Sequence, residues 1–155
     1  MASGAKGRRF ESCRARHGQF GGYGRPLIEA LDNVGVAVRD LERAVAFYRI
    51  LGFQPEYATE DSALLRAGGV ALYVFRTDGP VQPLRSFDLT GNAPGYDHLS
   101  FRVPDVDAAC RRLQELGVTV ERQPQDYPWG ARAACLRDPD GNCIWLLQRT
   151  GREEP

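Results

Sequence analysis

The chain contains an internal repeat, and this repeat limits the folds open to it more than any other feature does. Aligning the sequence with itself at an offset of 65 residues matches five positions in two well separated stretches. These matches are Val38 with Val103, Asp40 with Asp105, Ala44 with Ala109, Leu51 with Leu116 and Gly52 with Gly117. A period of this length indicates two copies of one structural unit.

Each copy begins with alternating apolar residues, in 33–38 and in 98–103, which is typical of a strand. Apolar residues at helical spacing follow Asp40 and Asp105, which suit helix N-caps. Gly52 suits the stop of the first helix. Further strands are expected at 53–59, 63–67 and 70–76 in the first copy and at 118–123, 131–137 and 143–149 in the second. The pattern predicts an α+β fold made of two strand-helix-three-strand units.

The chain's zero net charge is the sum of two unlike parts. Residues 1–26 hold six basic side chains and one acidic one, which leaves 14 basic and 19 acidic side chains from Leu27 on. The Gly- and Arg-rich segment 1–26 cannot bury enough apolar surface to fold, so we expect a disordered basic tail. Its arginines and aromatic residues suit nucleic acid, but we favour a simpler hypothesis. Residues 9–13 back-translate to something like the T-arm of a tRNA gene, so the native protein is expected to begin between Gly24 and Leu31.

Boundaries follow from the repeat and the composition. We expect one folded domain at 27–150, made of module one (31–76), a Gly- and Pro-rich linker (77–95) and module two (96–149), with a short tail at 151–155. No run of 18 apolar residues occurs, so no membrane partner is expected.

The four cysteines show no zinc-ligand spacing, so they favour a reducing, cytoplasmic location. Cys135 and Cys143 flank an expected hairpin and could approach each other, but small buried apolar residues are the preferred interpretation.

Two segments of module two carry a family resemblance. "DHLSFRVPDVDAACRRLQELGV" opens the module and "RDPDGNCIWLLQ" closes it. With the duplicated unit, they resemble the vicinal oxygen chelate superfamily, which contains glyoxalase I, extradiol dioxygenases, and fosfomycin- and bleomycin-resistance proteins. The likeness covers Leu31 to Arg149. It implies two tandem βαβββ modules whose curled sheets enclose one cleft, within one chain or by exchange between two chains of a homodimer.

The resemblance also implies where a metal would bind. In metal-dependent members the ligands lie on the opening and last strands of each module, and a second alignment, at an offset of 72, matches Tyr73 with Trp145. Carried onto this chain, the four ligand positions are Asn33, Tyr73, His98 and Trp145. Only His98 is a good metal ligand, and a divalent catalytic metal needs about three. We therefore expect no metal and no other cofactor.

Alternation along the strands predicts an aromatic cleft with a few polar groups, suited to a planar ligand. The expected ligand-binding residues are Asn33, Tyr73, Phe75, His98, Ser100, Trp129, Arg132 and Trp145. Trp129 lies in the segment 127–130, which could close over the cleft. Each residue has an alternative role: Tyr73 and Trp145 as core packing, Trp129 as core, and His98 as a structural histidine bonded to Asp97 or to a backbone carbonyl.

Three functions follow. The first is a metal-free binding protein that sequesters an aromatic or cationic natural product, as antibiotic-resistance proteins do, because the acidic folded part would attract cations. The second is a metal-free lyase or isomerase acting on an aromatic metabolite, with His98 as general base. A metalloenzyme of the glyoxalase kind fits the residues least. The abundance of arginine over lysine suggests a bacterium with a GC-rich genome.

Overall fold

The computed structural model describes residues 28–150, and those from Asp32 on belong to one compact unit. The basic segment 1–26, the end at 151–155 and Cys13 lie outside the described residues. No helix in the described range is long and apolar enough to cross a membrane.

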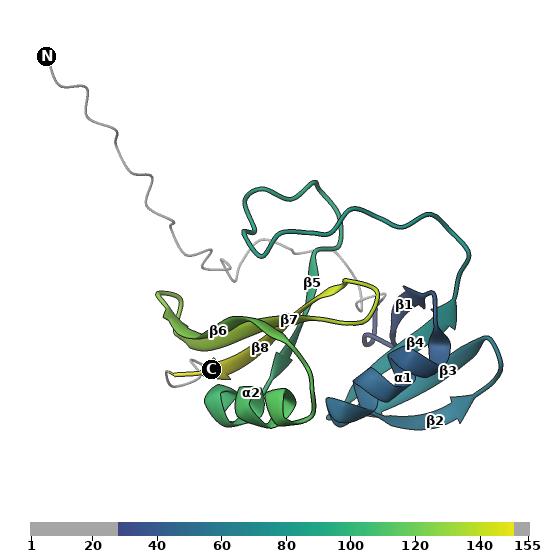
Figure 1. Cartoon of the computed structure of the whole chain (residues 1–155), viewed down its shortest axis with the longest axis horizontal. Coiled ribbons are helices and arrows are strands. Elements are labelled where there is room, and N and C mark those ends of the chain that lie inside the picture. The colour runs from purple at the N-terminus through teal and green to yellow at the C-terminus, as the bar shows by residue number, and fades with distance from the viewer. Residues whose placement is uncertain (1–27, 151–155) are drawn as a thin grey trace, which may run out of the picture. The chain divides into compact units, whose positions relative to one another are not determined.

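Two βαβββ modules are present, as the repeat predicts (Figure 1). The first comprises β1 (Val34–Val38), α1 (Leu41–Ile50), β2 (Gln54–Ala58), β3 (Ser62–Ala67) and β4 (Val70–Arg76). The second comprises β5 (His98–Arg102), α2 (Val106–Glu115), β6 (Val120–Tyr127), β7 (Ala131–Arg137) and β8 (Cys143–Arg149). The strand orders β1-β4-β3-β2 and β5-β8-β7-β6 are equivalent, and each opening strand pairs in parallel with its module's last strand. The predicted α+β fold is confirmed.

Local chemistry sets the helix ends. Asp40 and Asp105 adopt extended N-cap conformations, and each accepts a hydrogen bond from a backbone amide in the first turn, at 2.9 Å in both helices. Such a cap satisfies a donor that the helix cannot pair itself. Gly52 and Gly117 have φ angles of +100° and +81°, which glycine adopts at little cost and which end the helices.

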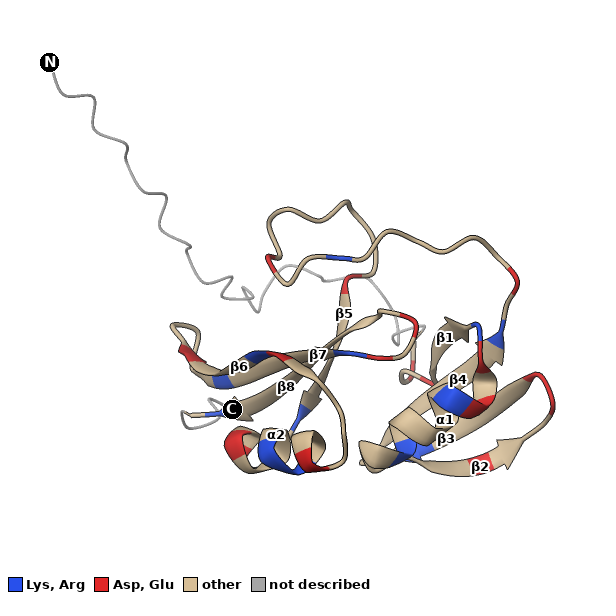
Figure 2. Ribbon diagram, in the orientation of Figure 1, with Lys and Arg blue, Asp and Glu red and all other residues tan. Residues whose placement is uncertain are grey.

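The main core lies between the helices and the sheets, and residues of both modules contribute to it. The Phe53 and Phe101 rings, one from each module, meet edge to face at 5.5 Å between centroids. Basic and acidic residues are interspersed along both helices (Figure 2).

A second, smaller apolar cluster lies on the other face of the second sheet. It comprises Phe87, Ala133, Cys135, Cys143 and Trp145. The opposite face of this sheet packs on α2 through Ala134, Leu136, Ile144 and Leu146, which belong to the main core. The second sheet is therefore apolar on both faces, and its helix-free face bears the candidate site.

Candidate functional site

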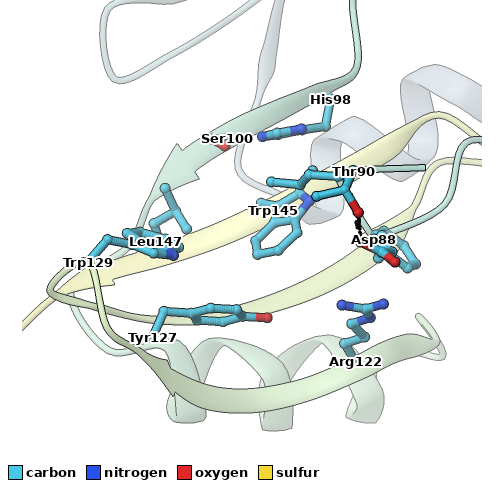
Figure 3. Close-up of a pocket in the computed structure, with 11 residues that line it drawn as sticks. Asp88, Thr90, His98, Ser100, Arg122, Tyr127, Trp129, Trp145 and Leu147 are labelled. Carbon is cyan, nitrogen blue, oxygen red and sulfur yellow. Dashed lines mark hydrogen bonds between the residues drawn. The ribbon is translucent and has the colours of Figure 1, made fainter. Parts of the chain in front are cut away.

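A cavity of about 420 Å³ opens on the helix-free face of the second sheet (Figure 3). Strands β5, β6 and β8, the β6–β7 turn and the linker between the modules all contribute to its wall. The lining residues are Phe87, Asp88, Leu89, Thr90, His98, Ser100, Arg122, Tyr127, Trp129, Trp145 and Leu147.

Trp145 forms the centre of the cavity wall. It is 4% exposed, and its ring lies 5.5 Å from the His98 ring and 5.6 Å from the Tyr127 ring, measured between centroids. Its neighbours Ile144 and Leu146 point to the main core, because side chains alternate along a strand. Its indole Nε1 is buried without a hydrogen-bond partner in the described part of the chain.

His98 is held by its neighbour. The Nδ1 atom of His98 lies 2.7 Å from Oδ1 of Asp97, and Oδ2 of the same carboxylate accepts a hydrogen bond from Asn92 Nδ2 at 2.6 Å. A carboxylate only accepts, so Nδ1 donates, and Nε2 is the ring atom left to face another partner. The hydrogen bond from His98 is the main reason that the pKa of Asp97 lies below its usual value. Figure 3 shows the ring at the cavity beside Ser100, so His98 has both the expected structural bond and a place in the wall.

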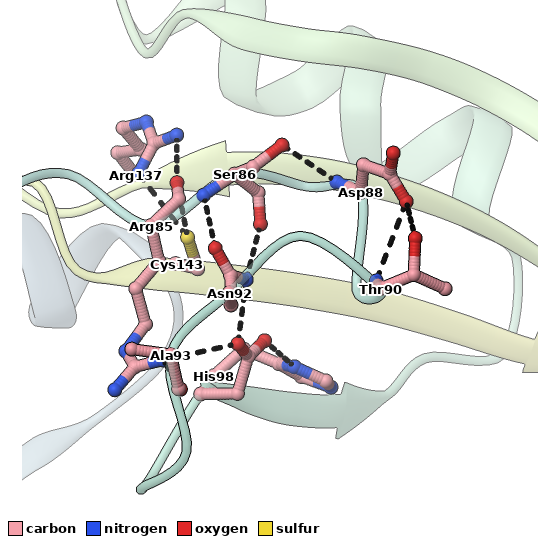
Figure 4. Close-up of polar contacts among 10 residues, drawn as sticks. Arg85, Ser86, Asp88, Thr90, Asn92, Ala93, His98, Arg137 and Cys143 are labelled. Atoms are coloured by element: carbon pink, nitrogen blue, oxygen red, sulfur yellow. Dashed lines mark hydrogen bonds and ion pairs between the residues drawn. The ribbon is translucent and has the colours of Figure 1, made fainter.

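The linker forms one side of the cavity and is pinned to the second module (Figure 4). Asn92 bonds Ser86 twice, accepting from its backbone N–H and donating to its carbonyl, both at 2.8 Å. These two bonds close a loop within the linker, and in this loop Phe87 is buried, with the Arg137 guanidinium carbon 4.4 Å from its ring centroid. Arg137 also donates to the carbonyl of Arg85 at 2.7 Å. A segment expected to serve only as a connection therefore supplies a wall.

The β6–β7 turn brings a third aromatic residue to the cavity. Trp129 is 50% exposed, and its ring lies 5.2 Å from that of Tyr127. Gly130 adopts a φ of +80°, which suits the turn. Strand β6 runs to Tyr127, four residues beyond the predicted end, so Tyr127 is a strand residue and Trp129 lies in the turn.

Of the residues expected to bind ligand, His98, Ser100, Trp129 and Trp145 line this cavity, whereas Asn33, Tyr73 and Phe75 do not. Tyr73 and Phe75 stack on each other in module one at 5.7 Å between centroids, and Asn33 is exposed before β1. This cavity is therefore lined by module two and the linker, and it is not the expected cleft shared by both modules.

Arg132, expected to point inward with the aromatic turn, faces the other way. Its guanidinium donates two hydrogen bonds to Asp107 of α2, at 2.7 and 2.9 Å. Strand alternation explains this placement, because Ala134 and Leu136 have the same parity and belong to the main core. The interaction with Arg132 lowers the pKa of Asp107.

Sequence reasoning missed two parts of the wall: Arg122 of β6 and the linker residues 87–90. Phe87 is the sole aromatic residue of the linker 77–95, and a lone aromatic residue there could have indicated that the linker packs on the domain. The sequence did not predict that Arg122 faces the cavity, because an irregularity in the pairing of β6 just before it interrupts the alternation of side chains.

The residues at the family's metal-ligand positions do not fit a metal. Trp145 is aromatic and lines the cavity, Tyr73 stacks on Phe75, and Asn33 is exposed before β1, so His98 alone offers a good ligand atom, its Nε2. Among residues 28–150 no three His, Cys, Asp or Glu side chains form a group that could hold a metal ion.

Comparisons with known proteins agree with the fold. The chain is 35% identical over 112 residues to mouse 4-hydroxyphenylpyruvate dioxygenase-like protein. The aligned region covers 67% of this chain but only 30% of the mouse protein. It is 32% identical over 124 residues to the uncharacterized protein YraH of Bacillus subtilis, covering 74% of this chain and 94% of YraH. The solved structure of SMU.1112c superposes with a TM-score of 0.64 at 30% identity, covering 77% of this chain and 98% of that one. The family model of the Glyoxalase/Bleomycin resistance protein/Dioxygenase superfamily matches residues 30–146, so the chain belongs to this superfamily.

Proposed function

We propose that the chain is a metal-independent small-molecule-binding protein whose ligand is a planar aromatic compound. The observation that carries this proposal is the ring arrangement of the cavity. Trp145, Tyr127 and Trp129 form a chain of ring contacts between 5.2 and 5.6 Å, and His98 extends it on the other side of Trp145. Centroid distances in this range suit stacking, and an aromatic ligand would add a further ring to the series.

The volume of the cavity supports the same proposal. About 420 Å³ lies within the range of pockets that hold small organic molecules. Polar groups at its edge, including His98, Ser100 and Thr90, would orient the ligand. With one imidazole at the family's metal-ligand positions, binding would depend on stacking and hydrogen bonds rather than on coordination.

Sequestration of an aromatic natural product, as in antibiotic resistance, is the role that we propose for this binding. A protein that only binds needs an aromatic cavity and no reactive constellation. The buried, unpaired thiols of Cys110, Cys135 and Cys143 suit the reducing cytoplasm that we propose as its location. Burial raises the pKa of the Cys135 thiol to about 12, so this thiol stays protonated and unreactive at neutral pH.

A thermal-shift screen tests the proposal. We expect planar aromatic antibiotics to raise the Tm of the purified protein, since a ligand at 100 times its Kd adds about 2.7 kcal/mol of stability. Excess EDTA is expected to leave both the Tm and the ligand-induced shift unchanged. Stoichiometric metal in the protein, or loss of the shift with EDTA, would contradict metal independence. Recovery of the ligand unchanged after release would support binding rather than conversion.

The Asp97–His98 pair favours a second candidate function, a metal-independent lyase or isomerase. Asp97 fixes the His98 ring so that Nε2 is free to accept a proton from a bound substrate. If the protein is an enzyme, His98→Ala should lower kcat about 100-fold or more. If it is a binder, the same variant should weaken binding only modestly, and no product should form. Mass spectrometry of the ligand after incubation distinguishes the two.

A homodimer is also proposed, because Tyr73 and Phe75 form a half-buried aromatic pair outside the cavity of their own chain. Exchange of modules between two copies would supply these rings to a shared cleft. A monomer mass in sedimentation equilibrium, with and without ligand, would refute it.

A further inference from the structure

Arg122 is a cation without an acidic partner in an aromatic wall. It is half-buried, it lines the cavity, and its guanidinium carbon lies 5.6 Å from the centroid of the Phe87 ring. No carboxylate of residues 28–150 is within ion-pair distance of it, whereas Arg132 is paired with Asp107 and Arg137 with Glu121. Among the residues that line the cavity, Arg122 is the one arginine or lysine, and the described residues give it no acidic partner.

Trp145 supplies a second unsatisfied donor to the same wall. Its residue is 4% exposed, and its Nε1–H, which can only donate, has no acceptor in the described part of the chain. Buried donors in proteins nearly always have an acceptor, so this unpaired donor beside the cavity favours a ligand that carries one. Arg122 lines the cavity and Trp145 Nε1 is buried in its wall, and the described residues supply no acceptor for either donor.

The linker side of the cavity has the opposite character. Asp88 accepts hydrogen bonds from the hydroxyl of Thr90 at 2.9 Å and from its amide at 3.3 Å. Its carboxylate would repel an anionic group, so such a group is expected to engage Arg122 and not the Asp88–Thr90 turn. Figure 3 shows Arg122 and Tyr127 extending into the cavity from the side opposite His98 and Ser100.

We propose that the ligand is a planar aromatic compound bearing an anionic oxygen group, a carboxylate or a phenolate, and that Arg122 is the residue that selects it. This inference rests on the proposed function and specifies its ligand class. A guanidinium binds a carboxylate through two parallel hydrogen bonds, which are stronger than bonds between neutral groups. The acidic net charge of the folded part favours cations at long range, but the contact group in the wall is basic, and short-range contacts determine specificity.

The two tryptophans of the chain make the test direct. The sequence contains only Trp129 and Trp145, and both line the cavity, so quenching of tryptophan fluorescence reports occupancy of this cavity. The probes are anthraquinone-2-carboxylate and its neutral counterpart anthraquinone-2-carboxamide, which share their ring system. We expect the wild type to bind the carboxylate about tenfold more tightly, as a charge-assisted hydrogen bond would give.

Three variants separate charge recognition from packing. Arg122→Met keeps the length of the side chain and should remove the carboxylate preference while leaving carboxamide binding within about twofold. Arg122→Lys keeps the charge and should retain part of the preference. Arg112→Met, which removes the same charge from α2, should leave the preference intact.

Each outcome decides between the claims. If the wild type binds both probes equally, or if Arg122→Met weakens both to the same extent, the inference is overturned while aromatic binding stands. If neither probe quenches the fluorescence, the proposed function and this inference are both refuted. A preference for the carboxylate that disappears in Arg122→Met alone supports the inference.

Discussion

Replacing Asp138 with alanine is expected to lower the free energy of unfolding by about 3 kcal/mol or more. Asp138 is 4% exposed and accepts hydrogen bonds from the amides of Asp140 and Asn142, at 3.0 and 2.8 Å, and from Asn142 Nδ2 at 2.8 Å. It also accepts one from the buried Tyr48 hydroxyl of α1, at 2.9 Å. Alanine would leave these donors without their acceptor. Urea unfolding followed by circular dichroism measures the loss.

Single-bond variants provide the control. Tyr48→Phe removes one of these bonds and should cost about 1 kcal/mol. Burial and the nearby Asp138 raise the pKa of Tyr48, so its hydroxyl remains a donor throughout the working pH range. Asp140→Ala removes a bond to the Arg39 amide, which is exposed, and should cost no more than about 1 kcal/mol. An Asp138→Ala protein within 1 kcal/mol of the wild type would contradict this account.

The second large effect is expected at Trp145. Trp145→Ala should lower the free energy of unfolding by about 3 kcal/mol, because it leaves a void in the cluster that contains Cys135 and Cys143. It should also remove detectable binding of aromatic ligands, since the residue forms the centre of the cavity wall. Isothermal titration calorimetry well below the unfolding temperature separates loss of binding from loss of structure.

Trp129 is the matched comparison, because it has the same side chain in the same cavity but is half-exposed. Trp129→Ala should cost less than about 1 kcal/mol of stability and should weaken an aromatic ligand by about three- to tenfold, the equivalent of one ring contact. If Trp129→Ala leaves affinity unchanged while Trp145→Ala unfolds the protein, the ring series has a structural role and the proposed ligand class fails.

The fold could be predicted because the sequence contains it twice. Every strand boundary read from alternation lies within two residues of the observed one, except at the end of β6. Residue types do not predict which face each side chain of β6 takes, because the pairing of β6 with β7 shifts between Val120 and Arg122 and again between Arg122 and Gln125. A bulge changes which face a side chain takes, and no pattern of residue types marks these positions.

Strand alternation also accounts for which site residues could be predicted from the sequence. On the regular strands β5 and β8, alternation placed His98, Ser100 and Trp145 on the helix-free face, where they line the cavity. Arg132 lies on the regular strand β7, so its parity with Ala134 was available and should have assigned it to the helix side. The linker could not be placed, because its position depends on bonds such as that between Asn92 and Ser86, which join residues through loop geometry.

The "RDPDGN" element, residues 137–142, is specific to the family but has a structural role, so it does not indicate a reaction or a ligand. Its Asp138 binds the turn's own backbone and the hydroxyl of Tyr48 on the other module, while Asp140 accepts from the amide of Arg39. The motif therefore joins the two modules and shapes a turn. Recognising it identifies the scaffold, on which unrelated reactions and binding functions occur.

The linker belongs to the same structural unit as module two, because its residues 87–90 form part of the cavity wall. The repeat divides the chain at residue 96, but the wall of the cavity begins at Phe87 and depends on anchors at Ser86 and Asn92. A graft of residues 96–149 into another protein would transfer the repeat and leave behind one side of its cavity. Insertions or deletions in the linker, which loops ordinarily tolerate, would here displace Phe87 and with it one wall of the cavity.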